Sequence, residues 1–242
     1  MKVTGDTNIG MKRQTNQDSY EVGFLEEDVA FAVVCDGMGG ANGGNVASQI
    51  AVEAITENLK KQYRSGLSGL SIKNLLVTSA NVANIKVYEK AKEDESLAGM
   101  GTTAVIALVK DDLIHVVNVG DSRAYLVAKD KISQITIDHS VVQALLDQGQ
   151  ISESDVRSYP NRNLITRAIG VSEELEADYF EVEFSEDGVL LICTDGLSNH
   201  LEDQDILNIV SVCSFREIPA ELIKLANQRG GNDNITVALI AR

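Results

Sequence analysis

Strand-like apolar runs in this 242-residue chain come in close pairs, and the short connections within the pairs strongly constrain the fold. The pairs are residues 102–109 with 113–119, 123–127 with 132–137, and 179–184 with 189–194. Parallel neighbours need a crossover of roughly a dozen residues or more, so these connections predict antiparallel neighbours. A last run, 235–241, closes the chain.

Helical periodicity lies in blocks between these runs. Residues 45–63 and 72–92 place apolar side chains at every third or fourth position, as one buried helix face requires. A further helix is expected to begin near Pro219 and to stop at Gly230 and Gly231. Paired strands with helices gathered in runs predict an α+β fold in layers, not an alternating parallel-sheet fold.

The domain organisation predicted for this chain is simple. It has two prolines and no low-complexity linker, so we expect one domain over residues 1–242. Residues 139–167 form a polar insertion with short helical patterns at 141–148 and 153–158, the second starting at Ser152 with Asp155 three residues later. This insertion is predicted to be a surface flap over a site.

Charge and composition exclude several classes of protein. The formal net charge of −15 argues against nucleic acid as a partner, because phosphate backbones are bound by Lys and Arg. We expect no membrane span, since no apolar run approaches twenty residues. The first ten residues lack the apolar core of a signal peptide. The odd number of cysteines, three, indicates a reducing compartment, so a cytoplasmic protein is predicted.

Aspartates recur at the ends of the predicted strands. They are Asp18, Asp36, Asp121, Asp195 and Asp233. Turn formation alone explains many Asp-Gly pairs. Here, however, apolar residues lead up to the carboxylates of Asp36 and Asp195, and the chain after Asp36 passes through glycines into a helix. The carboxylates are therefore expected to leave a core and to share one site.

Several carboxylates at one site repel each other unless protons or cations neutralise them. Oxygen ligands without histidine suit Mg²⁺ or Mn²⁺, and two such ions can clamp a phosphoryl group during in-line displacement. Glycine at position 37 leaves its carbonyl free to approach a metal. The glycines after Asp36 do not form a phosphate-binding loop, because Asn45 and Val46 replace the required Lys and Ser/Thr. They also lack the Gly-x-Gly-x-x-Gly spacing of a dinucleotide-binding fingerprint.

Six short motifs, in this order, resemble those of the metal-dependent serine/threonine protein phosphatases of type 2C, especially their short bacterial members. They are RQTNQD (13–18), DGMGG (36–40), GMGTTA (99–104), VGDSRAY (119–125), TDG (194–196) and GNDNIT (231–236). The resemblance covers nearly the whole chain. It implies a four-layer α-β-β-α sandwich of two antiparallel sheets flanked by helices, with residues 139–167 as the variable flap.

The resemblance also implies a metal site. Asp36 would bridge two Mn²⁺ or Mg²⁺ ions, with the Gly37 carbonyl on one of them, and Asp195 and Asp233 would complete the other. Asp121 together with Asp195 would hold a third, weaker ion.

Two further residues receive roles from the same resemblance. Asp18 would orient metal-bound water, and Arg13 would bind the substrate phosphate through its planar guanidinium. Many relatives carry histidine after Asp-Gly as a general acid, whereas this chain has Met38. Metal-bound water is the preferred replacement, and His200 is a weaker candidate. His115 and His139 are expected to be structural.

The predicted function is hydrolysis of phosphoserine and phosphothreonine on proteins, by direct attack of a metal-bridging hydroxide. The expected partners are phosphoproteins and a serine/threonine kinase that the enzyme opposes, and a monomer is expected. Two alternatives stay open: a hydrolase of small phosphate esters, and a catalytically silent regulator that binds phosphoproteins. No metal carboxylate is missing, which argues against the silent regulator.

Overall fold

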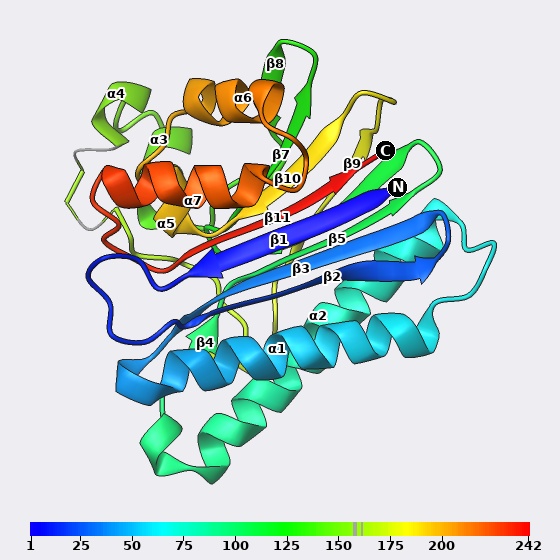
Figure 1. Ribbon diagram of the computed structural model, residues 1–242. Coiled ribbons are helices and arrows are strands. Elements are labelled where there is room, and N and C mark those ends of the chain that lie inside the picture. Colours follow the sequence, from blue (N-terminus) through cyan, green and yellow to red (C-terminus); the bar gives the residue numbers. More distant parts are fainter. Residues whose placement is uncertain (157–158, 161) are drawn as a thin grey trace.

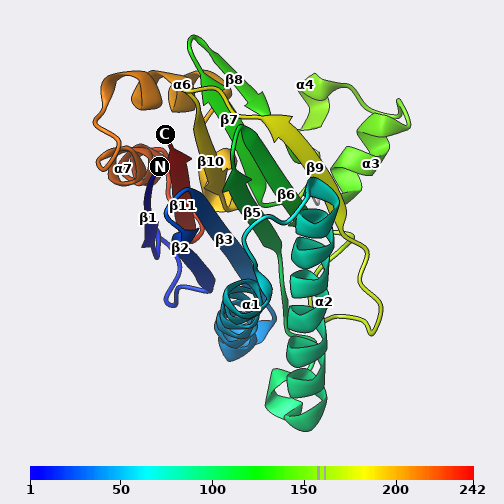
Figure 2. The ribbon, with the colours of Figure 1, turned by 90° about the vertical axis from the view of Figure 1, so that its right-hand side faces the viewer.

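The computed structural model describes residues 1–156, 159–160 and 162–242 (Figure 1). Two antiparallel sheets pack face to face, and helices cover both outer faces (Figures 1 and 2). This arrangement confirms the predicted α-β-β-α sandwich. Within the ranges described, none of the helices combines the length and hydrophobicity that crossing a membrane requires.

Each sheet mixes strands from distant parts of the chain. The first has the order β1 (Lys2–Asn8), β11 (Ile235–Ala241), β10 (Val189–Cys193), β7 (Arg123–Ala128), β8 (Lys131–Gln134). The second has the order β2 (Asp18–Glu26), β3 (Val29–Met38), β5 (Ala104–Lys110), β6 (Leu113–Val119), β9 (Asp178–Glu183), and β4 (Gly101–Thr102) pairs with the end of β3.

The central strands are apolar throughout because both of their faces are buried. In β3, Phe31 and Val33 face the helices, whereas Ala32 and Val34 face the other sheet. Strand β11 repeats this arrangement. Burial on both sides explains why these runs are continuous rather than alternating.

Helices form the two outer layers. On the second sheet lie α1 (Gly40–Gln62) and α2 (Gly69–Glu93), and on the first lie α5 (Asp195–Ser198), α6 (Asp203–Val212) and α7 (Ile218–Gln228). Figure 2 shows the two groups on opposite sides of the sandwich. The remaining helical segments are η1 (Glu95–Leu97), α3 (Val141–Asp147) and α4 (Glu153–Val156).

One predicted strand pair is wrong. Strand β9 pairs with β6 in the second sheet, whereas β10 pairs with β7 and β11 in the first. The five residues between them, 184–188, cross from one sheet to the other, and Phe184 packs between the sheets at the crossing. A short connection thus joins strands of two different sheets here, whereas the prediction assumed that a short connection joins antiparallel neighbours in one sheet.

Several element boundaries also differ from prediction. Strand β3 continues two residues past Asp36, because β4 pairs with Gly37 and Met38. Helix α1 begins at Gly40 rather than at residue 45. The start of α4 is as predicted, since the Ser152 backbone N–H donates to the Asp155 carboxylate over 3.0 Å. Positions 157 and 158 of that predicted helix lie outside the described residues.

Candidate active site

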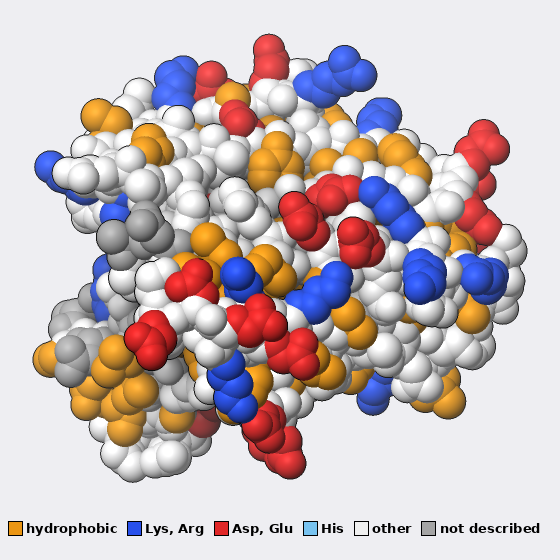
Figure 3. Space-filling view, turned by 90° about the horizontal axis from the view of Figure 1, so that it is seen from below, with side chains coloured by type: hydrophobic (Ala, Val, Ile, Leu, Met, Phe, Trp, Pro, Cys, Tyr) orange, Lys and Arg blue, Asp and Glu red, His pale blue; other side chains and the backbone are white. Residues whose placement is uncertain are grey.

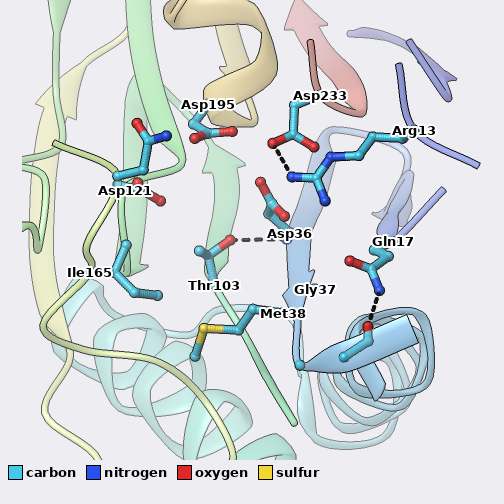
Figure 4. Close-up of a pocket in the computed structure, with 13 residues that line it drawn as sticks. Arg13, Gln17, Asp36, Gly37, Met38, Thr103, Asp121, Ile165, Asp195 and Asp233 are labelled. Carbon is cyan, nitrogen blue, oxygen red and sulfur yellow. Dashed lines mark hydrogen bonds and ion pairs between the residues drawn. The ribbon is translucent and has the colours of Figure 1, made fainter. Parts of the chain in front are cut away.

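A cavity of about 430 Å³ brings the predicted site residues together (Figure 4). It is lined by Arg13, Gln17, Asp36, Gly37, Met38, Gly39, Gly40, Thr103, Asp121, Asn163, Ile165, Asp195 and Asp233. Four of the five predicted aspartates and the predicted arginine therefore share one cavity. Asp18 is not among the lining residues and lies behind it, next to Asp36 across β2 and β3.

The backbone of Asp36 is fixed from both sides. Its N–H donates to the Thr103 hydroxyl over 2.9 Å, and its carbonyl accepts from the Thr102 hydroxyl over 2.8 Å. The Asp36 carboxylate points into the cavity (Figure 4). Desolvation raises the pKa of Asp36 well above its usual range, and the charges of Asp18 and Asp195 add to the shift.

Asp18 is a buried carboxyl held by the first sheet. Its Oδ2 accepts hydrogen bonds from the hydroxyls of Thr194 and Thr236, over 2.9 and 2.7 Å. Its Oδ1 is buried and has no hydrogen-bond partner in the described structure. Burial raises the pKa of Asp18 to about 7, although the two threonine hydrogen bonds work in the opposite direction.

Asp195 is the first residue of α5, and, as in Asp18, only one of its two carboxyl oxygens is hydrogen-bonded. Its Oδ2 accepts from Asn199 Nδ2 over 3.0 Å, whereas its buried Oδ1 has no partner among the described residues. Desolvation, followed by the charge of Asp233, raises the pKa of Asp195. Desolvation and the charge of Asp195 likewise raise the pKa of Asp121, to about 8.

Arg13 lies at the open side of the cavity. Its Nη2 donates to Asp233 Oδ2 over 2.7 Å, and both side chains keep contact with solvent. The hydrogen bond to Asp233 is the main reason why the pKa of Arg13 is raised. A guanidinium at this position offers further donors to an anion that enters the cavity.

The chemistry of these side chains fits hard divalent cations. In the described part of the chain, no three His, Cys, Asp or Glu side chains are arranged to hold a metal as they stand. Arg13 occupies one oxygen of Asp233. Yet the donors are all oxygens, and one buried carboxyl oxygen each of Asp18 and Asp195 has no hydrogen-bond partner among the described residues. Divalent cations would offset the repulsion between the clustered carboxylates, and Mg²⁺ and Mn²⁺ prefer oxygen ligands.

Gly37 has a structural reason to be glycine. A β-carbon there would lie 1.9 Å from the carbonyl oxygen of Gly44 in α1, so this helix leaves no room for a side chain. The Gly37 N–H also donates to the Gln17 carbonyl over 3.1 Å. The close approach of α1 thus accounts for this glycine without any metal, and its role as a ligand stays a prediction.

The histidines lie outside the cavity. His139 Nδ1 accepts from the Gly120 N–H over 3.1 Å, and His115 Nδ1 lies 2.7 Å from the Tyr179 hydroxyl. Both are buried in structural contacts, as expected. His200 Nε2 accepts from the Asn232 N–H and does not line the cavity, which removes the geometric basis for a general acid at His200.

Sequence reasoning missed several residues of the site. Thr103 and Asn199 position Asp36 and Asp195 through hydrogen bonds. Gln17 and Ile165 line the cavity directly. Thr103 and Gln17 lie within the motifs GMGTTA and RQTNQD, which could have indicated them. Ile165 lies within the predicted flap at 139–167, but no motif there singles it out.

The chain matches the family described as protein phosphatase 2C over residues 5–239. It is 36% identical over 237 residues to the serine/threonine phosphatase stp of Listeria innocua, which covers 98% of this chain and 94% of that protein. The structure of the S. agalactiae serine/threonine phosphatase superposes with a TM-score of 0.92 at 33% identity, covering 99% of this chain and 98% of that one. The catalytic domain of the serine/threonine protein phosphatase PstP, in complex with 2 manganese ions, superposes with a TM-score of 0.85 at 30% identity, covering 98% and 96% of the two chains.

Proposed function

The chain belongs to the protein phosphatase 2C family of serine/threonine phosphatases, and on that premise we propose that its cavity hydrolyses phosphoserine and phosphothreonine on proteins with the help of bound Mn²⁺ or Mg²⁺. The observation that carries this proposal is the meeting of Arg13 with four aspartates in one cavity. Strong similarity to a phosphatase with two bound manganese ions supports the metal.

We propose that two ions would be held by the carboxylates of Asp36, Asp195 and Asp233 and by the Gly37 carbonyl, with Asp36 as the shared ligand. Asp121 together with Asp195 is the proposed place of a third ion. The partnerless buried oxygen of Asp195 and the raised pKa values of Asp36 and Asp121 support this set. When bound, the ions supply Lewis acidity that activates water and offsets charge on the phosphoryl oxygens.

The protein side chains bind and orient the reactants. Arg13 is proposed to bind two phosphoryl oxygens through its fork, giving up part of its contact with Asp233 as the phosphate enters. Asp18 is proposed to orient the attacking water, since its Oδ1 has no partner in the described structure. Met38 cannot donate a proton, and none of the three histidines lines the cavity, so water is the proposed proton donor to the leaving group.

The cellular setting belongs to the same proposal. We propose that this monomeric enzyme works in the cytoplasm and opposes a serine/threonine kinase. The family supports a phosphoprotein substrate, and the net charge of −15 supports the exclusion of nucleic acid.

Phosphate release by metal-stripped protein tests the proposal. A phosphothreonine peptide and a set of small phosphate esters are compared after treatment with EDTA and after addition of Mn²⁺, while calorimetry measures Mn²⁺ binding. The proposal expects no turnover without metal, restored turnover with Mn²⁺, and a higher kcat/KM for the peptide. Turnover that survives EDTA contradicts the metal site, and preference for a small ester identifies a hydrolase of small esters instead.

A further inference from the structure

The catalytic cavity has one apolar side. Met38 and Ile165 line it away from Arg13 and Asp233, as Figure 4 shows. Arg13 and Asp233 thus lie on one side of the cavity, whereas Met38 and Ile165, whose side chains have no hydrogen-bonding role, line another part, with Asp121 beside Ile165 (Figure 4). The hydrolytic reaction gives Met38 and Ile165 no task.

The apolar side continues out of the cavity toward Val171. A β-carbon on Gly101 would lie 2.9 Å from Met38 Cε and 2.8 Å from Val171 Cγ1, so the two methyl groups converge over that glycine. Val171 is 49% exposed. We call Met38, Ile165 and Val171 the apolar wall.

Backbone hydrogen bonds hold the apolar wall in place. Ile165 forms a β-bridge with Ser140. Thr102 and Ile169 exchange two backbone hydrogen bonds of 3.0 and 2.8 Å, which fix the segment that leads to Val171. The wall is thus a prepared surface rather than a loose loop, and it keeps apolar groups exposed beside the cavity.

On the face seen from below, acidic and basic side chains are interspersed, and hydrophobic side chains are exposed in several places, with one group at a corner (Figure 3). Exposure alone therefore does not mark a subsite, and its continuity with the cavity is the distinguishing feature of the apolar wall. A prepared apolar surface that continues a binding cavity is typical of a recognition subsite.

We propose that the apolar wall binds an apolar side chain adjacent to the phosphorylated residue, so that the enzyme prefers phosphopeptides with residues such as leucine there. The inference rests on the proposed function and names its substrate class. With the phosphate held near Arg13, a neighbouring side chain of the peptide would meet Met38, which lines the cavity, and the exposed Val171 beside Met38. Each methylene that the wall removes from water favours binding by roughly fourfold.

Two phosphothreonine peptides of equal length test the inference, one with leucine and one with asparagine on both sides of the phosphothreonine. Leucine and asparagine have similar size, so the comparison isolates polarity. The wild-type enzyme is expected to show a kcat/KM roughly tenfold higher for the leucine peptide, mostly through KM, because the contact is the same in the ground and transition states.

Variants that replace an apolar side chain of the wall by a polar one locate the preference. Met38→Gln, Ile165→Thr and Val171→Thr are each expected to reduce the leucine-to-asparagine ratio by about two- to fivefold. Val212→Thr is the matched control, since Val212 is 81% exposed on α6 and does not line the cavity, and it should leave the ratio unchanged. Thermal unfolding confirms that each variant is folded.

Three results overturn the inference: a wild-type ratio near one, a ratio that none of the three wall variants changes, or an equal loss in Val212→Thr. A peptide with flanking lysines provides a further test. If its kcat/KM is higher than that of the leucine peptide and the difference shrinks with added salt, specificity comes from surface charge and the inference is also overturned. If neither peptide is hydrolysed with Mn²⁺ present, the proposed function itself has failed, which separates the two cases.

Discussion

Asp18 and Asp36 stand directly opposite each other on the paired strands β2 and β3, so two carboxyl groups share one face of a sheet. Like charges at such a cross-strand pair destabilise a sheet. Desolvation, followed by the charge of Asp18, raises the pKa of Asp36, and desolvation raises the pKa of Asp18. The fold therefore carries a repulsion that protons relieve in the free protein and that cations are proposed to relieve in the working enzyme.

Asp36→Asn is expected to lower the activity of the enzyme and to raise the stability of the metal-free protein. The variant loses the proposed bridging carboxylate, so kcat should fall by about three orders of magnitude at saturating Mn²⁺, equivalent to about 4 kcal/mol. The metal-free variant should unfold a few degrees higher than the wild type at pH 8, because a buried charge is gone. Phosphopeptide turnover and calorimetric unfolding measure both effects, and near-normal turnover refutes the role of Asp36.

The stability of the metal-free protein is expected to fall as the pH rises from 6.5 to 8. Folding raises the pKa of Asp18 to about 7 and of Asp121 to about 8, both from 3.8. In this window the folded state therefore holds protons that the unfolded chain has released, and stability declines with pH by about 2–3 kcal/mol in total. Mn²⁺ should abolish or reverse the slope, because metal replaces the protons.

Denaturant titrations at several pH values measure this slope, and Asp121→Asn is its control. The variant lacks one of the groups with a raised pKa, so its metal-free slope should be shallower than that of the wild type. A wild-type stability that rises between pH 6.5 and 8 without metal contradicts the account.

Arg13→Lys is expected to weaken substrate binding without weakening the fold. The pair with Asp233 is partly exposed, so its loss should change the free energy of unfolding by less than about 1 kcal/mol. Lysine keeps the charge but not the planar fork, and kcat/KM for a phosphopeptide should fall by about 10- to 100-fold. Steady-state kinetics check this, and an unchanged kcat/KM places the phosphate elsewhere.

Thr236→Val is expected to disturb Asp18 specifically. The variant removes the 2.7 Å hydrogen bond to Asp18 Oδ2, which favours the ionised form, so the pKa of Asp18 should rise further. Activity should then require a higher pH, and stability should fall by about 1–3 kcal/mol. Thr7→Val is the matched control, because Thr7 bonds to Thr236 but not to Asp18. Equal pH profiles in the two variants rule out the Asp18 effect.

The sequence predicted which aspartates line one cavity better than it predicted strand pairing. Aspartates at strand ends, together with glycines, indicated Asp36, Asp121, Asp195 and Asp233 because each local pattern is short. The hydrogen bonds that hold Asp18 could not be predicted, since their donors, Thr194 and Thr236, lie 176 and 218 positions away in the sequence. Such contacts depend on how the two sheets face each other.

The same limit explains the error at β9 and β10. A five-residue connection fits a hairpin and a crossing between layers equally well, and only the packing of Phe184 between the sheets decides. The single domain over residues 1–242, the flap at 139–167 and the individual roles of the site residues stay predictions.

Anomalous diffraction from crystals soaked in Mn²⁺ tests the metal centre most directly. The account predicts two strong peaks in the cavity that share the Asp36 carboxylate, with Asp195 and Asp233 on one of them, and a weaker peak at Asp121. Peaks that lie elsewhere, or a cavity with no peak at saturating Mn²⁺, would contradict it.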